Sequence, residues 1–183
     1  MKTLIIHPKD RSTDFLAPIY QNIENKTVVT GGVSRKEIRE MIKQHDRTIM
    51  LGHGCPTGLF SVGQFDAGWM IIDYTMVDLL KQQNDNIYIW CNADKFVRNH
   101  NLKGLYSGMF ISEVGEAEYC LSRTYPQDLV DTSNNTFAQV LGEALVVGTT
   151  TGDIFEDMMT EYSSLIDENA IANYNFQRLY LDI

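Results

Sequence analysis

The stretch "RTIMLGHG", residues 47–54, decides the fold that we expect for this chain. Its first five residues form an apolar run that is typical of a strand buried on both faces of a parallel sheet. The run then breaks into glycine, His53 and glycine. Because parallel sheets carry their functional groups at the carboxyl ends of their strands, the stretch predicts an α/β fold with His53 at its candidate site.

Expected strands and helices alternate along the whole chain. The expected strands are 3–7, 26–30, 47–51, 86–90 and 108–112, with a β-like run at 176–181. The expected helices are 12–23, 34–45, 74–83, 115–123, 135–146 and 152–166; a β-hairpin is expected at 58–73 and a loop at 124–134. This alternation predicts a three-layer α/β/α sandwich with a mostly parallel sheet, formed by a single domain over residues 1–183.

The composition of the chain argues against some classes of binding partner and favours one cellular location. The chain has 183 residues and a formal net charge of -9, which argues against nucleic acid as a partner because phosphate binding needs clustered lysine and arginine. No run approaches the roughly 18 apolar residues of a membrane span, so no membrane partner is expected. Three cysteines without a CxxC pair favour free thiols and a cytoplasmic location.

A second buried run, "NIYIW" at 86–90, ends at Cys91. If its strand lies beside 47–51, roughly 5 Å away, the imidazole of His53 and the thiol of Cys91 emerge side by side. A neighbouring base makes a cysteine useful as a nucleophile, because an unperturbed thiol, with a pKa of about 8.5, is mostly neutral at pH 7. The sequence therefore predicts Cys91 as nucleophile and His53 as base, with His7, Asp73 or a backbone carbonyl as candidates for orienting His53.

The order of these segments resembles that of the caspase-like (clan CD) cysteine peptidases, which include caspases, metacaspases, legumains, gingipain-like and clostripain-like enzymes, separases and CHAT domains. "TIMLGHGCPTGLF" is similar to their histidine motif and "NIYIWCNAD" to their cysteine motif, over roughly residues 1–115. The resemblance implies a caspase–hemoglobinase fold and hydrolysis of peptide bonds through a thioester, without a cofactor. It also implies that the backbone N–H groups of Gly54 and Cys91 form an oxyanion hole.

Two positions depart from the family pattern. Trp90 stands before the cysteine, where many members have a small residue. Ile89 stands where metacaspase-like enzymes that cut after arginine or lysine carry aspartate and where caspases carry glutamine, so neither specificity is expected. Glu113, at the end of the expected fifth strand, is a candidate for lining a pocket that prefers a basic side chain; the alternative is a solvated glutamate.

Other functions stay open at this point. The same fold could serve without turnover as an interaction or ligand-sensing module, which Trp90 and the missing aspartate favour. In a flavodoxin-like binding domain the pairing of His53 with Cys91 would be coincidental. A metal site from His53, Cys55 and Cys91 lacks a fourth ligand, so no metal is expected. A protein or peptide substrate is the expected partner, and a homodimer is left open.

Overall fold

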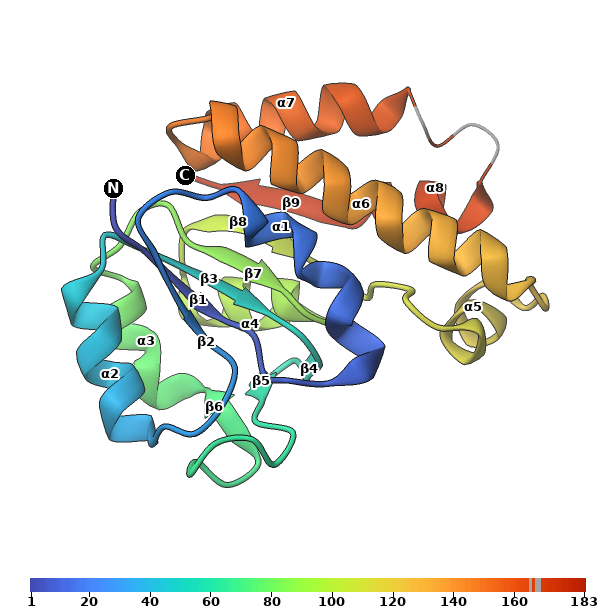
Figure 1. The fold of residues 1–183 in the computed structure, drawn as a ribbon. Helices are drawn as coiled ribbons and strands as arrows, with labels where there is room; N and C mark the ends of the chain where they lie inside the picture. The colour runs from blue at the N-terminus through green and yellow to red at the C-terminus, as the bar shows by residue number, and fades with distance from the viewer. Residues whose placement is uncertain (165, 167–168) are drawn as a thin grey trace.

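A six-stranded sheet forms the centre of the protein (Figure 1). The computed structural model describes residues 1–164, 166 and 169–183. The strand order is β2 (Lys26–Val29), β1 (Thr3–Ile6), β3 (Arg47–Leu51), β7 (Ile87–Ile89), β8 (Gly104–Ser107) and β9 (Leu179–Asp182). Neighbouring strands are parallel except for β9, which runs antiparallel to β8. The predicted α/β class with a mostly parallel sheet is therefore confirmed.

Helices cover both faces of the sheet, an arrangement compatible with a three-layer sandwich (Figure 1). On one face lie α2 (Arg35–Gln44), η2 (Tyr74–Met76), α3 (Val77–Leu80) and α4 (Ala93–His100). On the other lie η1 (Arg11–Leu16), α1 (Pro18–Gln21), α6 (Gln127–Val147), α7 (Thr151–Ser163) and α8 (Ala170–Phe176). The remaining helix, α5 (Val114–Leu121), packs on a smaller apolar cluster around Ile111 and Val130.

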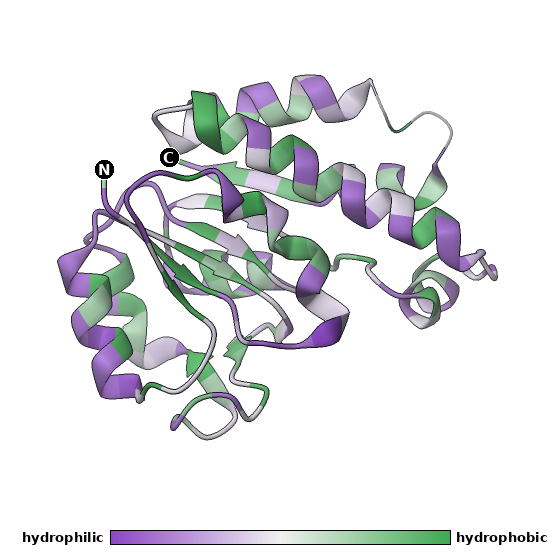
Figure 2. Ribbon diagram, in the orientation of Figure 1, coloured by the Kyte–Doolittle hydropathy of each residue, from purple (hydrophilic) through white to green (hydrophobic). Residues whose placement is uncertain are grey.

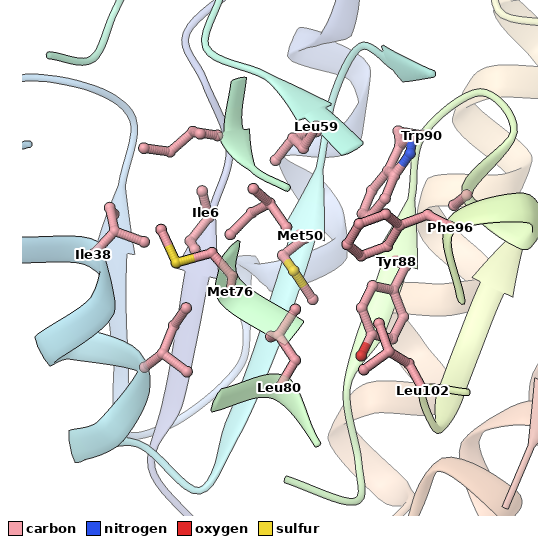
Figure 3. Close-up of a cluster of buried hydrophobic side chains, with 14 of the residues drawn as sticks. Ile6, Ile38, Met50, Leu59, Met76, Leu80, Tyr88, Trp90, Phe96 and Leu102 are labelled. Atoms are coloured by element: carbon pink, nitrogen blue, oxygen red, sulfur yellow. The ribbon is translucent and has the colours of Figure 1, made fainter. Parts of the chain in front are cut away.

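Strand β3 shows why the sheet is buried on both faces. All five of its residues are buried, and successive side chains point to opposite faces. Met50 belongs to the cluster under α2 and α3, where Figure 3 shows it beside Met76 and Leu80. Ile49 and Leu51 belong to the cluster under α6. Figure 2 shows the same division, with hydrophobic residues along the strands and hydrophilic residues on the outer sides of the helices.

A second, three-stranded antiparallel sheet follows His53. It consists of β4 (Gly54–Cys55), β5 (Gly58–Phe60) and β6 (Met70–Ile72), so the predicted hairpin is present with one additional short strand. The predicted capping box of the 34–45 helix is also present, because the Ser34 side chain accepts from the Glu37 backbone while the Glu37 carboxylate accepts from Ser34.

Two predicted elements are wrong. Residues 108–112 are not a strand: the fifth strand is β8, and the apolar residues Phe110 and Ile111 are buried in an irregular segment that follows it. The predicted loop at 124–134 is limited to residues 124–126, because α6 begins at Gln127, directly after Pro126. Its first turns bury the polar residues Ser133 and Asn134, which read as loop residues in the sequence.

Several helices also differ from the prediction. The 12–23 helix divides into η1 and α1, since Pro18 lacks the backbone N–H that a continuous helix needs and stands at the start of α1. The 152–166 helix ends at Ser163, and Leu165 lies outside the described residues. Helices α4 and α8 were not predicted at all; Phe96 and Val97 bury the inner face of α4, and Ile171 and Ala172 that of α8.

Candidate functional site

His53 and Cys91 emerge at the same edge of the sheet. Strands β3 and β7 are parallel neighbours with Leu51 opposite Ile89, and the Gly52 N–H continues the pairing by donating to the Ile89 carbonyl at 3.1 Å. Both His53 and Cys91 line one narrow cavity of about 20 Å³, which has room for little more than a water molecule. The predicted adjacency of the two strands is therefore confirmed, and it brings the two side chains to one cavity.

The imidazole of His53 is held by residues of η1. Its Nε2 lies 2.6 Å from Ser12 Oγ and 4.0 Å from Asp10 Oδ2, and Ser12 Oγ lies 2.8 Å from Asp10 Oδ1. A hydroxyl has one proton, so both short contacts are satisfied when Ser12 donates to Asp10 and accepts from Nε2–H. That arrangement leaves the lone pair of a neutral His53 on Nδ1, the atom that can act as a base.

Asp10 is suited to be the final acceptor in this chain of hydrogen bonds from His53 through Ser12. It caps the start of η1, and its Oδ1 accepts from the Ser12 backbone N–H at 3.0 Å. That bond, helped by the Ser12 hydroxyl and by the nearby His53, lowers the pKa of Asp10 below its ordinary value. The carboxylate is therefore ionised at neutral pH, and it fixes the direction of the hydrogen bonds that reach His53.

His7 and Asp73, which we expected as candidates for orienting His53, interact with other residues instead. His7 is buried and hydrogen-bonds through its two ring nitrogens to Tyr20 and Thr13, and burial lowers its pKa. Asp73 caps η2 and pairs with Arg35. The sequence analysis missed Asp10 and Ser12. The available signal was an Asp-x-Ser sequence at a helix start, just after the carboxyl end of the first strand.

The thiol of Cys91 makes its hydrogen bonds with residues other than His53. Its Sγ donates to the Phe110 carbonyl at 3.3 Å and lies 3.7 Å from Glu116 Oε1. Burial and, to a smaller extent, the negative charge of Glu116 raise the pKa of Cys91 to about 12. The thiol is therefore neutral at physiological pH in this arrangement, and its sulfur contacts the segment after β8 and helix α5.

Glu116 is itself firmly fixed. Its second oxygen, Oε2, accepts from the backbone N–H of Ser112 at 2.7 Å, from the Ser112 hydroxyl at 3.0 Å and from the Glu113 N–H at 3.2 Å. These hydrogen bonds cap the N-terminus of α5. One carboxylate thus joins the start of α5 to the sulfur of Cys91, so the position of that helix and the state of the thiol are linked.

Trp90 explains why position 54 is a glycine. The indole is buried, donates from Nε1 to the Cys55 carbonyl at 3.1 Å and packs directly on Gly54. A Cβ at position 54 would clash with Cδ1 of Trp90 and with the Gly58 carbonyl oxygen. The large residue before Cys91 therefore fastens the loop after His53 to β7. Figure 3 shows this indole beside Phe96 at the end of the core cluster.

Substituting Gly54 with alanine is expected to destabilise the protein. Overpacking of this kind costs about 1–3 kcal/mol, or roughly 3–10 °C in Tm for a chain of this size. Gly115→Ala is the matched control, because a Cβ there meets no atom within 4 Å and alanine favours the helix. Thermal unfolding of both variants checks this; an unchanged Tm for Gly54→Ala would contradict the close packing of Trp90.

The proposed oxyanion donors occupy the same edge. The backbone N–H of Cys91 has no hydrogen-bond acceptor among the described residues, whereas the next amide, of Asn92, donates to the Gly108 carbonyl at 3.0 Å. Asn92 adopts a left-handed conformation with φ of 65°, which turns the chain sharply into α4. The amide of Cys91 is thus left for another acceptor.

Glu113 lines a larger cleft next to the His53 cavity. This cleft, of about 490 Å³, is also lined by Arg11, Asp131 and Asn134. It shares the wall residues Phe15 and Ser112 with the small cavity. An extended ligand in the cleft would therefore lie beside His53 and Cys91.

Other groups near the site take no part in it. Cys55 contacts Thr57 at 3.1 Å, and all three cysteines are free thiols. Within the described ranges, no three histidine, cysteine or acidic side chains are grouped closely enough to hold a metal ion. Nor does that part of the chain contain a helix long and apolar enough to span a membrane.

Comparison of the chain with protein-family models, with curated proteins and with solved structures found no match.

Proposed function

We propose that this chain is a cysteine hydrolase with a caspase-like fold, which cleaves peptide bonds through a His53–Cys91 dyad and is held here in a resting arrangement. The observation that carries the proposal is the convergence of both side chains on one cavity at the carboxyl ends of neighbouring parallel strands. The order of segments around them, from a buried strand through His-Gly, a small antiparallel sheet and a helix to a second buried strand, agrees with the family resemblance.

The chemistry follows from the residues at this edge. His53 Nδ1 takes the proton of the Cys91 thiol, and the sulfur attacks the carbonyl carbon of a peptide bond. The amides of Cys91 and Gly54 stabilise the oxygen that becomes negative, an effect worth roughly 10²–10³ in rate per donor. The imidazolium then protonates the leaving amine, and water hydrolyses the thioester. Ser12 and Asp10 keep the His53 ring in position through both proton transfers.

One local change separates this resting arrangement from an active one. The thiol must leave the Phe110 carbonyl and Glu116 and turn toward His53. Such a turn breaks one weak hydrogen bond, at a cost of about 0.5–1.5 kcal/mol, and moves the sulfur away from a negative charge. The change is small enough to accompany the binding of a substrate.

The adjoining cleft suits a protein or peptide substrate. Glu113 and Asp131 give its wall two carboxylates against one cation, Arg11, which favours a basic side chain next to the scissile bond. The free thiols agree with a reducing, cytoplasmic setting. The cleft and the cavity are both lined within one chain, so the proposed chemistry does not require a homodimer.

A second candidate is a caspase-like interaction or ligand-sensing module that performs no turnover. The specific observation in its favour is the thiol of Cys91, whose pKa is raised to about 12 by burial and by Glu116. A nucleophilic cysteine ordinarily has a lowered pKa. The two candidates differ in whether Cys91 can reach a reactive state that depends on His53.

Alkylation with limiting iodoacetamide at pH 7.5 separates the two candidates. The reagent reacts with thiolate, so the reactive form of Cys91 in a peptidase is the one paired with protonated His53. We expect His53→Ala to slow alkylation of Cys91 by about 3–10-fold and to leave Cys55 unchanged, with sites mapped by mass spectrometry. Equal rates at Cys91 with and without His53 would favour the module without turnover.

A further inference from the structure

Arg47 is a buried cation at the end of the sheet opposite His53. It begins β3, and its side chain shares a face with Ile49 and Leu51, under α6. Only 3% of Arg47 is exposed. Its Nη2 donates to Thr3 Oγ1 at 3.2 Å, but the N–H groups on Nε and Nη1 have no acceptor among the described residues.

No carboxylate in the described part of the chain lies within ion-pairing distance of this guanidinium. Burial lowers the pKa of Arg47, and the more distant Asp85 only partly opposes that effect. The Asp85 carboxylate is already used, since it accepts from the backbone N–H of Thr151 at 2.8 Å and from its hydroxyl at 3.2 Å. A buried guanidinium without a paired anion, and with two of its three nitrogen atoms lacking an acceptor, is strongly unfavourable, so Arg47 is a candidate for binding an anion.

Arg47 lines a cavity of about 520 Å³, a volume typical of small-molecule sites. Its walls combine polar groups with apolar ones; they include Thr3, Asn22, Ile23, Leu145 and Val146. We propose that this cavity binds a small monocarboxylate with an apolar tail, whose carboxylate accepts hydrogen bonds from Arg47 and whose tail lies against the apolar wall. This inference does not rest on the peptidase proposal, because the two sites lie at opposite ends of the sheet.

The surroundings favour a monoanion over a phosphate. Arg47 supplies one positive charge, while Glu24 also lines the cavity and Asp85 lies near the guanidinium. The C-terminal end of α6, which reaches the cavity at Leu145 and Val146, adds partial negative charge. A dianion would be repelled by all three. One carboxylate neutralises Arg47 without excess charge, and Ile23, Leu145 and Val146 line the cavity with apolar groups against which a tail can pack.

Thermal unfolding and calorimetric titration of the whole chain test this proposal. The probes are sodium acetate, butyrate and hexanoate, with inorganic phosphate as a separate arm, all at constant ionic strength. We expect saturable binding that tightens from acetate to hexanoate and, at saturation, raises Tm by roughly 2–6 °C. Arg47→Met should abolish the shift, whereas Arg123→Met, which removes an exposed guanidinium elsewhere, should keep it.

A second variant covers the case in which Arg47→Met does not fold. Val146 is 56% exposed and lines the cavity, so Val146→Trp narrows the cavity without touching Arg47. We expect it to weaken hexanoate binding by about tenfold or more, which corresponds to the lost contacts of the tail. The proposal is overturned if no carboxylate binds saturably to the unaltered protein, if binding survives Arg47→Met, if Val146→Trp binds hexanoate as tightly as the unaltered protein does, or if phosphate binds more tightly than hexanoate.

Discussion

Replacing Glu116 with glutamine is expected to raise the rate at which iodoacetamide alkylates Cys91 by about 10–100-fold at pH 7.5. The carboxylate lies 3.7 Å from the sulfur and opposes its ionisation. Below the pKa of a thiol, the thiolate fraction rises tenfold for every unit by which that pKa falls. Burial, the larger cause of the raised pKa, is left in place by this substitution, so the gain has a limit.

The dependence of the Cys91 alkylation rate on pH tests the same prediction more stringently. With a pKa of about 12, the unaltered Cys91 should react faster at every step from pH 6 to pH 10 without reaching a plateau. In Glu116→Gln the whole profile should move toward lower pH. Glutamine can still accept from the backbone N–H of Ser112, so the start of α5 is retained and Tm should change little.

Glu113→Gln is the matched control for this experiment. It removes the same charge from the same end of α5, and Glu113 is exposed and is not among the groups that raise the pKa of Cys91. Its alkylation profile should coincide with that of the unaltered protein. A folded Glu116→Gln variant that reacts no faster than Glu113→Gln would show that the carboxylate does not hold Cys91 in its neutral state.

The backbone of this site follows from local sequence. The apolar runs that end at His53 and Cys91 are typical of strands buried on both faces, and such strands lie in the middle of a parallel sheet. Their carboxyl ends must then meet at one edge. The capping box of Ser34 and Glu37 likewise depends on residues three apart, so the sequence alone predicts it.

The side-chain partners could not be predicted in this way. Cys91 Sγ contacts Glu116, which is 25 residues away in the sequence, and His53 contacts Ser12, which is 41 residues away. Both contacts depend on irregular backbone: the segment after β8 in one case and the 3₁₀ helix η1 in the other. Apolar periodicity carries no information about such segments. The buried Phe110 even made residues 108–112 look like a strand.

Cys91→Ala is expected to lower the rate of peptide cleavage by about 10³-fold or more, the loss that follows removal of a covalent nucleophile. The reaction is best measured with a peptide library in the Glu116→Gln background, where the thiol is freed from its carboxylate neighbour. Cys55→Ala should keep full activity, because its sulfur hydrogen-bonds to Thr57 and Cys55 does not line the cavity that holds His53 and Cys91. This control separates loss of the nucleophile from loss of any thiol near the cavity.

The outcome also decides between the two candidate functions. Cleavage that depends on both Cys91 and His53 requires the thiol to turn away from the Phe110 carbonyl, since the resting sulfur donates there. Cleavage that survives Cys91→Ala would exclude this thiol as the nucleophile. If neither the unaltered chain nor Glu116→Gln cleaves any peptide while both bind peptides in the cleft beside Glu113, the protein is a binding module, and Cys91 is a structural cysteine that packs against Phe110.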